Sequence, residues 1–239
     1  YAALGYDHAY KGISDVRSLI FYERKRIVST LFDIQHGIVL DAGCGPGVYT
    51  DFLSKAEHTS YGIDISINMI NVAHKKCFPR AHFSVGSVEH IPFPDNSFDG
   101  VLCIGVLEYL GNLDCAIQEI SRVIKQNGVA IFTIPNKLSI LNVIDALLRV
   151  SLKLINRVCK SNFIKSVMDP NYELHTVSAF TLNKILEKEG FKIEKECYHI
   201  FRLSFLNKIA PNISFLISKK MNFISHPFLG INYIVKCRK

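Results

Sequence analysis

Short apolar runs alternate with amphipathic stretches along the first 135 residues of this chain. The runs predict five buried strands, over residues 38–41, 60–65, 81–85, 98–104 and 128–134. The stretches between them predict helices over 48–55, from a capping Ser66 to about residue 77, and over 113–125. Strands that alternate with helices in this way are typical of an α/β fold with a doubly wound parallel sheet and right-handed crossovers.

The alternation breaks after Pro135. Residues 136–176 exceed an ordinary loop and include an amphipathic stretch over 138–158, and residues 201–226 form a second apolar and basic insertion. A helix over 178–189 and strands over 191–198 and 230–236 resume the pattern. We therefore predict one domain with a Rossmann-like, mostly parallel seven-stranded sheet. Its parts are a helical cap (1–37), a core (38–135), a lid insertion (136–176) and a C-terminal core (177–239) that carries the helical insertion 201–226.

Within the cap, residues 1–32 predict one or two helices with a partial apolar stripe. Arg24, Lys25 and Arg26 are expected on the outer side of that stripe. Met69, one turn into the helix that Ser66 caps, is expected to pack in the core.

Composition narrows the class of protein. The chain has 239 residues, of which 49% are apolar, so it can bury a large core. Its seven cysteines stand singly, without a C-x-x-C pair or a zinc-type His/Cys spacing, which predicts no metal site and favours a reducing, cytoplasmic setting. Neither a secretory leader nor a membrane span is recognised, because Asp145, Arg149 and Lys153 interrupt the most apolar window, 138–155.

The net charge of +7 is unevenly distributed. No Asp or Glu follows Glu196, whereas seven basic residues do: Arg202, Lys208, Lys219, Lys220, Lys236, Arg238 and Lys239. A basic end of this kind suits nucleic acid, an anionic membrane surface or a solvated face. A peripheral membrane contact therefore stays open, and nothing in the pattern predicts an oligomeric state.

The most specific motif is the glycine turn after the first strand. Gly43, Gly45 and Gly47 alternate behind Asp41, and a helix begins at Val48. Glycine allows unusual backbone angles and the close approach of a ligand, while the helix directs its free N–H groups at whatever lies over the turn. The spacing differs from the G-x-G-x-x-G fingerprint of dinucleotide folds, whose third glycine comes one place later. A nicotinamide-type dehydrogenase is thus disfavoured, as is a redox role for Cys44 in the turn.

Residues 39–47 resemble motif I of the class I S-adenosylmethionine-dependent methyltransferases. Two further segments extend the resemblance in the expected order. Residues 91–99, IPFPDNSFD, resemble the LPF-x-D-x-SFD run of the small-molecule branch, similar to enzymes of quinone and menaquinone biosynthesis. Residues 103–109, CIGVLEY, match a segment in which the family often has LEH, with Tyr109 in place of the histidine. The resemblance covers about residues 38–134 and implies a methyltransferase with S-adenosylmethionine as cofactor, S-adenosylhomocysteine as product and no metal.

The resemblance also implies how the cofactor lies. The predicted cofactor residues are Asp41, Ala42, Gly43, Gly45 and Gly47 at the methionine end, Asp64 at the ribose, Ile65, Ser87 and Val88 around the adenine, and Ile104 after the fourth strand. The family usually has Asp at position 87, so this chain departs from the pattern at Ser87. The family often contacts the methionine carboxylate from the cap, where Tyr6, Tyr10 and Arg17 are the candidates.

Methyl transfer asks little of the protein, because a sulfonium methyl is already an activated electrophile and alignment supplies most of the acceleration. A base is needed only where the acceptor must lose a proton. His175, where the first insertion rejoins the core, and Tyr109 are the candidate catalytic residues, although His175 also suits an ordinary loop histidine. Glu108 could equally orient its loop or touch a substrate.

Apolar helix faces in both insertions predict a small, largely apolar acceptor: a natural product, a quinone, an isoprenoid or a lipid-linked metabolite. The simpler alternative is that these helices pack on each other as a lid. The basic end keeps an RNA or other nucleic-acid methyltransferase as an alternative, but no Asn/Asp-Pro-Pro-Tyr-like segment follows the fourth strand, so no nucleic-acid partner is expected. A non-enzymatic scaffold that retains the fold is the other alternative, which the departure at Ser87 leaves open.

Overall fold

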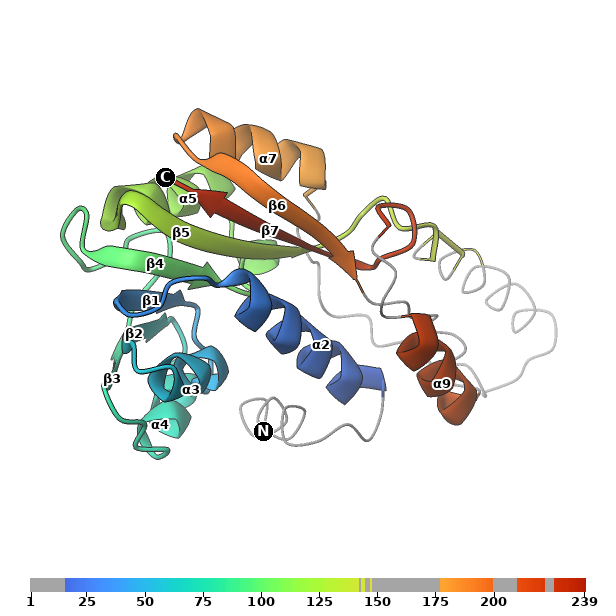
Figure 1. The fold of residues 1–239 in the computed structure, drawn as a ribbon, viewed down its shortest axis with the longest axis horizontal. Coiled ribbons are helices and arrows are strands. Elements are labelled where there is room, and N and C mark those ends of the chain that lie inside the picture. The colour runs from blue at the N-terminus through green and yellow to red at the C-terminus, as the bar shows by residue number, and fades with distance from the viewer. Residues whose placement is uncertain (1–15, 142, 145–146, 148–176, 200–209, 222–225) are drawn as a thin grey trace.

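A seven-stranded sheet forms the centre of the molecule in the computed structural model, which describes residues 16–141, 143–144, 147, 177–199, 210–221 and 226–239 (Figure 1). The strand order is β3-β2-β1-β4-β5-β7-β6. The strands are β1 (Ile38–Ala42), β2 (Thr59–Asp64), β3 (Ala81–Val85), β4 (Phe98–Cys103), β5 (Ile124–Pro135), β6 (Lys192–His199) and β7 (Asn232–Arg238). Strands β1 to β5 pair in parallel, and β7 runs antiparallel to both β5 and β6. The predicted fold class is confirmed.

Helices cover both faces of the sheet (Figure 1). They are α2 (Val16–Leu31), α3 (Val48–Lys55), α4 (Ile67–His74), α5 (Leu113–Val123), α7 (Ala179–Lys188) and α9 (Pro211–Met221), together with the short 3-10 helix η1 (Leu107–Tyr109). No helix among these described residues combines the length and apolar content needed to cross a membrane.

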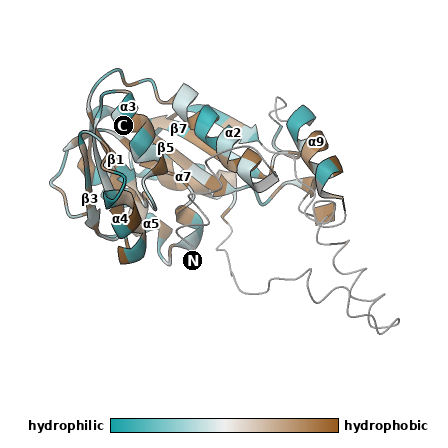
Figure 2. Ribbon diagram, turned by 90° about the horizontal axis from the view of Figure 1, so that it is seen from below, coloured by the Kyte–Doolittle hydropathy of each residue, from teal (hydrophilic) through white to brown (hydrophobic). Residues whose placement is uncertain are grey.

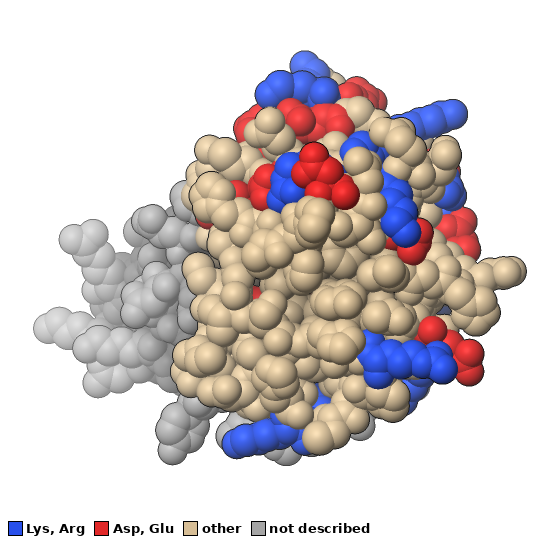
Figure 3. All heavy atoms as spheres, turned by 90° about the vertical axis from the view of Figure 1, so that its left-hand side faces the viewer, with Lys and Arg blue, Asp and Glu red and all other residues tan. Residues whose placement is uncertain are grey.

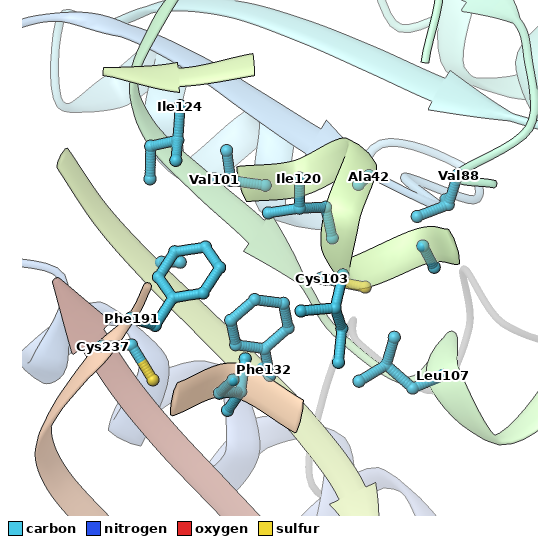
Figure 4. Packing of buried hydrophobic residues seen from close by; sticks show 14 of the residues in the cluster. Ala42, Val88, Val101, Cys103, Leu107, Ile120, Ile124, Phe132, Phe191 and Cys237 are labelled. Atoms are coloured by element: carbon cyan, nitrogen blue, oxygen red, sulfur yellow. The ribbon is translucent and has the colours of Figure 1, made fainter. Parts of the chain in front are cut away.

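Consecutive residues of the central strands point to opposite faces and so supply two separate cores. Leu40 and Phe132 pack with α5 and α7 on one face, whereas their neighbours Val39 and Ile131 pack with α2 and α3 on the other. Figure 4 shows the first core, in which Phe132 meets Phe191 edge to face at 5.8 Å between ring centroids. Figure 2 shows the hydrophobic residues concentrated along the central strands. Burial on both faces is the physical reason that these strands are apolar at nearly every position.

Most predicted elements lie within one or two residues of the observed ones. The helix over 48–55 has the predicted bounds, and Ser66 caps α4 by accepting a hydrogen bond from the Met69 N–H at 3.4 Å. Two boundaries differ more: the helix predicted to reach about residue 77 ends at His74, and the strand predicted from residue 128 already begins at Ile124, directly after α5 ends at Val123. Ile124 has extended backbone angles there and pairs with Phe98. Pairing with a distant strand therefore overrides the local helical pattern.

Candidate active site

A cavity of about 480 Å³ lies beyond the carboxyl ends of β1, β2 and β4. Five segments form most of its wall: the glycine loop after β1, residues 64–66 with Met69, residues 86–89 after β3, residues 104–110 after β4, and the side of α2. The start of α3 and Asn232 of β7 complete it. The ends of neighbouring parallel strands open one crevice at this edge of a doubly wound sheet. The expectation that Met69 packs in the core is wrong, because this side chain belongs to the cavity wall.

The three glycines of the loop adopt the left-handed backbone conformation, with φ of 77° at Gly43, 52° at Gly45 and 79° at Gly47. A Cβ on Gly43 would stand 2.2 Å from Cγ2 of Val106, so this position lets the loop close against the segment after β4. At Gly45 nothing lies within 4 Å of the corresponding point. Gly45 therefore leaves its backbone open to the cavity.

The carboxylate of Asp64 joins β2 to the glycine loop. Its Oδ2 accepts a hydrogen bond from the Gly45 N–H at 2.9 Å, and its Oδ1 accepts one from the Ser66 N–H at 2.8 Å. Each carboxylate oxygen keeps a second lone pair for a ligand. Asp64 lines the cavity, so these two bonds hold a negatively charged acceptor group in a set orientation at its wall.

Asp41 lies behind the loop and not on the cavity wall. Its side chain is 1% exposed, and the Thr50 hydroxyl donates to its Oδ2 at 2.8 Å. Burial raises the pKa of Asp41 to about 7, while the hydrogen bond from Thr50 opposes part of that rise. Ala42 is fully buried, and Gly47 instead caps the loop through its N–H to the Cys44 carbonyl. These three predicted cofactor residues thus support the loop from behind.

The other predicted cofactor residues meet at the cavity: Gly43, Gly45, Asp64, Ile65, Ser87, Val88 and Ile104. Ile65 is 79% exposed, which is unusual for an isoleucine, whereas Val88 is buried. The hydroxyl of Ser87 accepts a hydrogen bond from the Glu89 N–H at 3.2 Å. It therefore stabilises its own turn, as serine commonly does in loops.

Helix α2 brings Arg24 to the cavity, which corrects the expectation that this residue faces outward. Its guanidinium lies 5.0 Å from the ring centroid of Phe21, and its Nη1 is 3.0 Å from where a Cβ on Gly105 would stand. Ile20, Phe21 and Arg24 all line the cavity, as expected for residues one helical turn apart. The signal that sequence reasoning missed was therefore helical spacing, since Arg24 follows Ile20 by four residues.

Glu108 and Tyr109 follow β4 on η1 and line the same cavity. Glu108 is 8% exposed, and its Oε2 has no hydrogen-bond partner among the described residues. Burial raises the pKa of Glu108, and the nearby charge of Arg24 opposes the rise. Tyr109 is half exposed at the cavity wall. The side chains of Tyr6, Tyr10, Arg17 and His175 lie outside the described part of the chain.

Within the described ranges, no group of three or more His, Cys, Asp or Glu side chains is arranged to hold a metal ion. Cys44 is buried in the glycine loop, and burial raises the pKa of its thiol. A thiol held in its protonated form is a poor nucleophile. Cys44 is therefore a buried structural residue of the loop.

Comparison with known proteins finds similar sequences and similar folds. Residues 40–132 match a family model described as a methyltransferase domain. The fold also matches two S-adenosylmethionine-dependent methyltransferases. One, from Thermotoga maritima and described as a possible histamine N-methyltransferase, has a TM-score of 0.61 and 19% identity over 97% of this chain and 98% of that one. The other, from Mesorhizobium loti, has a TM-score of 0.65 and 12% identity over 92% and 100% of the two chains.

Residues 40–132 are thus similar to a methyltransferase domain, and the fold is similar to that of S-adenosylmethionine-dependent methyltransferases. Two uncharacterised proteins of Methanocaldococcus jannaschii are similar in sequence: one is 37% identical over 52% of each chain, the other 29% identical over 92% of this chain and 88% of its own. A demethylmenaquinone methyltransferase of Tropheryma whipplei is 33% identical over 38% of each chain. The chain therefore spans about half the length of the first of these relatives and less of the third.

Proposed function

We propose that the protein transfers the methyl group of S-adenosylmethionine to a small, largely apolar acceptor. The observation that carries this proposal is the Asp64 carboxylate, which is held against the open Gly45 backbone at the wall of a cavity of about 480 Å³. A carboxylate at the end of the second strand suits the two hydroxyls of a ribose. The space beside Gly45, which a Cβ would enter, suits a ligand that lies against the backbone.

The residues at the cavity fit the two parts of the cofactor, its adenosine and its methionine. Asp64 would accept the ribose hydroxyls, and the exposed Ile65 with Ser87 and Val88 would hold the adenine. Gly43 and Ile104 would flank the methionine end. When bound, S-adenosylmethionine supplies the activated methyl group. The absence of Asp at position 87 leaves the adenine edge to the backbone and to the Ser87 hydroxyl.

Arg24 is our candidate for the methionine carboxylate. It is the cation that α2 brings to the cavity, and it lies beside Gly105 at the end of β4. An arginine in such a partly desolvated place forms strong charge-assisted hydrogen bonds with a carboxylate. This assignment moves the expected contact from Arg17 to a residue two helical turns later in the cap.

An apolar acceptor is supported by the cavity wall near α2 and η1. Ile20, Phe21, Val106 and Leu110 line it there beside the half-exposed Tyr109. The relative from Tropheryma whipplei is named for demethylmenaquinone, which is an apolar acceptor. In the proposed step, an electron pair of the acceptor attacks the methyl carbon and the sulfonium sulfur takes the electrons of the broken C–S bond. Tyr109 and His175 remain the candidates for orienting the acceptor or receiving its proton.

The test has two arms. Calorimetric titration with S-adenosylmethionine and S-adenosylhomocysteine should give binding that Asp64→Ala strongly weakens and the exposed control Asp114→Ala retains. Methyl transfer should then be found among quinones, isoprenoids and lipid-linked metabolites, measured as S-adenosylhomocysteine formed. Methylation of only polar acceptors such as sugars would contradict the apolar assignment. Steeply salt-dependent RNA methylation would favour the nucleic-acid alternative, and a folded protein that binds neither ligand would favour a scaffold.

A further inference from the structure

Helix α9 buries polar residues and exposes apolar ones, which is the reverse of an ordinary surface helix. Ser214 and Ser218, one turn apart, are only 2% and 1% exposed, whereas Ile213, Leu216 and Ile217 are 56%, 53% and 39% exposed. The helix packs against α2 (Figure 1), and Figure 2 shows hydrophilic and hydrophobic residues mixed along it. A surface helix normally turns its apolar stripe toward the core. On α9 that stripe is left outside.

The segment after β5 shows the same inversion. Ser139 is fully buried and donates through its hydroxyl to the Leu229 carbonyl at 3.1 Å, while the flanking Leu138 and Ile140 are 56% and 49% exposed. The Ile140 N–H donates to the Phe228 carbonyl at 2.7 Å, which ties this segment to the loop before β7. Like α9, it lies beyond the right-hand end of the sheet in Figure 1.

We call this surface the apolar end. Its exposed apolar residues are Leu138, Ile140, Val143, Ile144, Leu147, Ile213, Leu216, Ile217 and Phe228. They make up most of the large apolar side chains that the described residues expose. Single exposed apolar residues are ordinary, but so many at one end of a molecule mark a surface that meets another molecule.

The charges at the apolar end are all positive among the described residues of 136–147 and 210–232. They are Lys137, Lys219 and Lys220, all exposed, and none forms an ion pair with a described residue. The other described basic residues after Glu196 are engaged elsewhere. Lys236 and Arg238 pair with Asp33 and Glu194, and the Lys239 ammonium donates to the carbonyls of Ser121 and Ile124. Figure 3 views the opposite end of the molecule, where basic and acidic side chains are interspersed.

We propose that the apolar end docks on an anionic phospholipid bilayer, with Ile213, Leu216 and Ile217 inserted among the lipids and Lys219 and Lys220 at the headgroups. Apolar residues beside lysines that have no acidic partner among the described residues complement such a surface. A nucleic acid would match the lysines but not the exposed isoleucines and leucine of the same helix. Because α9 packs on α2, and α2 lines the cavity, docking would also bring the cavity close to lipid-dissolved molecules. That last consequence rests on the proposed apolar acceptor, whereas docking itself does not.

The test is flotation of the full chain with vesicles of phosphatidylcholine alone or mixed with phosphatidylglycerol. We expect binding to the mixed vesicles, release by high salt, and binding weaker by roughly tenfold or more in the triple variant Ile213→Ser/Leu216→Ser/Ile217→Ser, since three apolar side chains leave the lipid. Lys219→Glu/Lys220→Glu should weaken binding to the mixed vesicles. The matched control is Phe180→Ser, which removes a 66% exposed side chain from α7 and should change nothing.

Three results would overturn the proposal: the wild type does not float with either kind of vesicle, it floats equally with neutral and with mixed vesicles, or the triple variant floats as well as the wild type. Light scattering that shows a dimer lost in the triple variant would instead assign the apolar end to a second copy of this chain. Titration with S-adenosylhomocysteine separates this proposal from the enzymatic one. The triple variant should bind it like the wild type, and failure of the wild type to bind it would contradict the proposed function alone.

Discussion

The Asp64 carboxylate accepts a hydrogen bond from the backbone N–H of Gly45 at 2.9 Å. The two residues stand 19 positions apart, one at the end of β2 and the other in the loop after β1. The bond therefore fixes the position of the glycine loop relative to the acid that we assign to the ribose. Loop conformation and ligand binding depend on the same side chain.

Replacement of Asp64 should separate these two roles. Asparagine keeps one oxygen that can accept from Gly45 or from Ser66, whereas alanine keeps neither. We expect S-adenosylhomocysteine affinity to fall in the order wild type, Asp64→Asn, Asp64→Ala, with the last loss worth about 2–3 kcal/mol because hydrogen bonds to a charged group are removed. Calorimetric titration measures the order. Equal affinity of wild type and Asp64→Ala would refute the ribose assignment.

Gly45→Ala tests whether the open space beside the loop belongs to the ligand. The left-handed backbone makes the substitution costly by about 1–2 kcal/mol of unfolding free energy. Gly190 is a matched control, since it also has positive φ and no atom within 4 Å of the point where a Cβ would stand, but it lies outside the cavity. We expect similar losses of stability in urea unfolding for both variants, and a loss of S-adenosylhomocysteine binding for Gly45→Ala only.

Arg24→Gln should discriminate between two ligands that differ in one part. S-adenosylhomocysteine carries the α-carboxylate that we assign to Arg24, whereas 5′-methylthioadenosine has no amino-acid part. We expect roughly tenfold weaker binding of the first ligand and unchanged binding of the second, because a single charged contact is lost. Arg26→Gln, at an exposed arginine that pairs with Glu23, serves as the control. A parallel loss for both ligands would mean that Arg24 only supports the fold.

Thr50→Val should destabilise the protein, and more strongly at higher pH. The hydroxyl of Thr50 is the side-chain donor to the buried Asp41, whose pKa is raised to about 7. Above that pH the group is a buried carboxylate, for which a lost hydrogen bond costs more than for the neutral acid. We expect a loss of about 2 kcal/mol at alkaline pH and a smaller one well below pH 7. Thr30→Val on the exposed side of α2 should show no such dependence.

His199 should make the fold sensitive to acid. It is 2% exposed at the end of β6, and burial together with the positive charges of Arg24 and Arg26 lowers its pKa to about 3. The unfolded chain binds a proton below its usual pKa of about 6.5, but the folded chain does not until about 3. Stability is therefore retained above about pH 6.5 and falls by about 1.4 kcal/mol per pH unit below it.

The measurement is urea unfolding of the wild type and of His199→Leu across this pH range. The variant should lose this one-proton slope, whereas His226→Gln, at an exposed histidine, should retain it. Identical slopes in all three proteins would show that other groups govern the acid sensitivity.

Local pattern determined much of this protein. The spacing of the apolar residues predicted the type and order of the helices and strands, because this spacing differs between the two and is set by residues close in the sequence. The glycine turn predicted a loop that a ligand can approach closely. Gly43 and Gly45 have positive φ, which few other residues adopt, so the sequence alone indicates this backbone conformation. From these features the fold class and the place of Asp64 at the cavity follow, whereas the cofactor is a proposal that rests on the family resemblance.

Tertiary packing decided which side of each helix or strand contacts the cavity or a neighbouring element. Arg24 reaches the cavity only because α2 lies over the end of β4, and Asp41 lies behind the loop because Thr50 of α3 packs over it. Likewise, the packing of α9 on α2 buries Ser214 and leaves Ile213 outside, contrary to residue polarity. Which side of an element meets a partner depends on residues far away in the chain. A local pattern contains no information on those contacts, so only the folded structure reveals them.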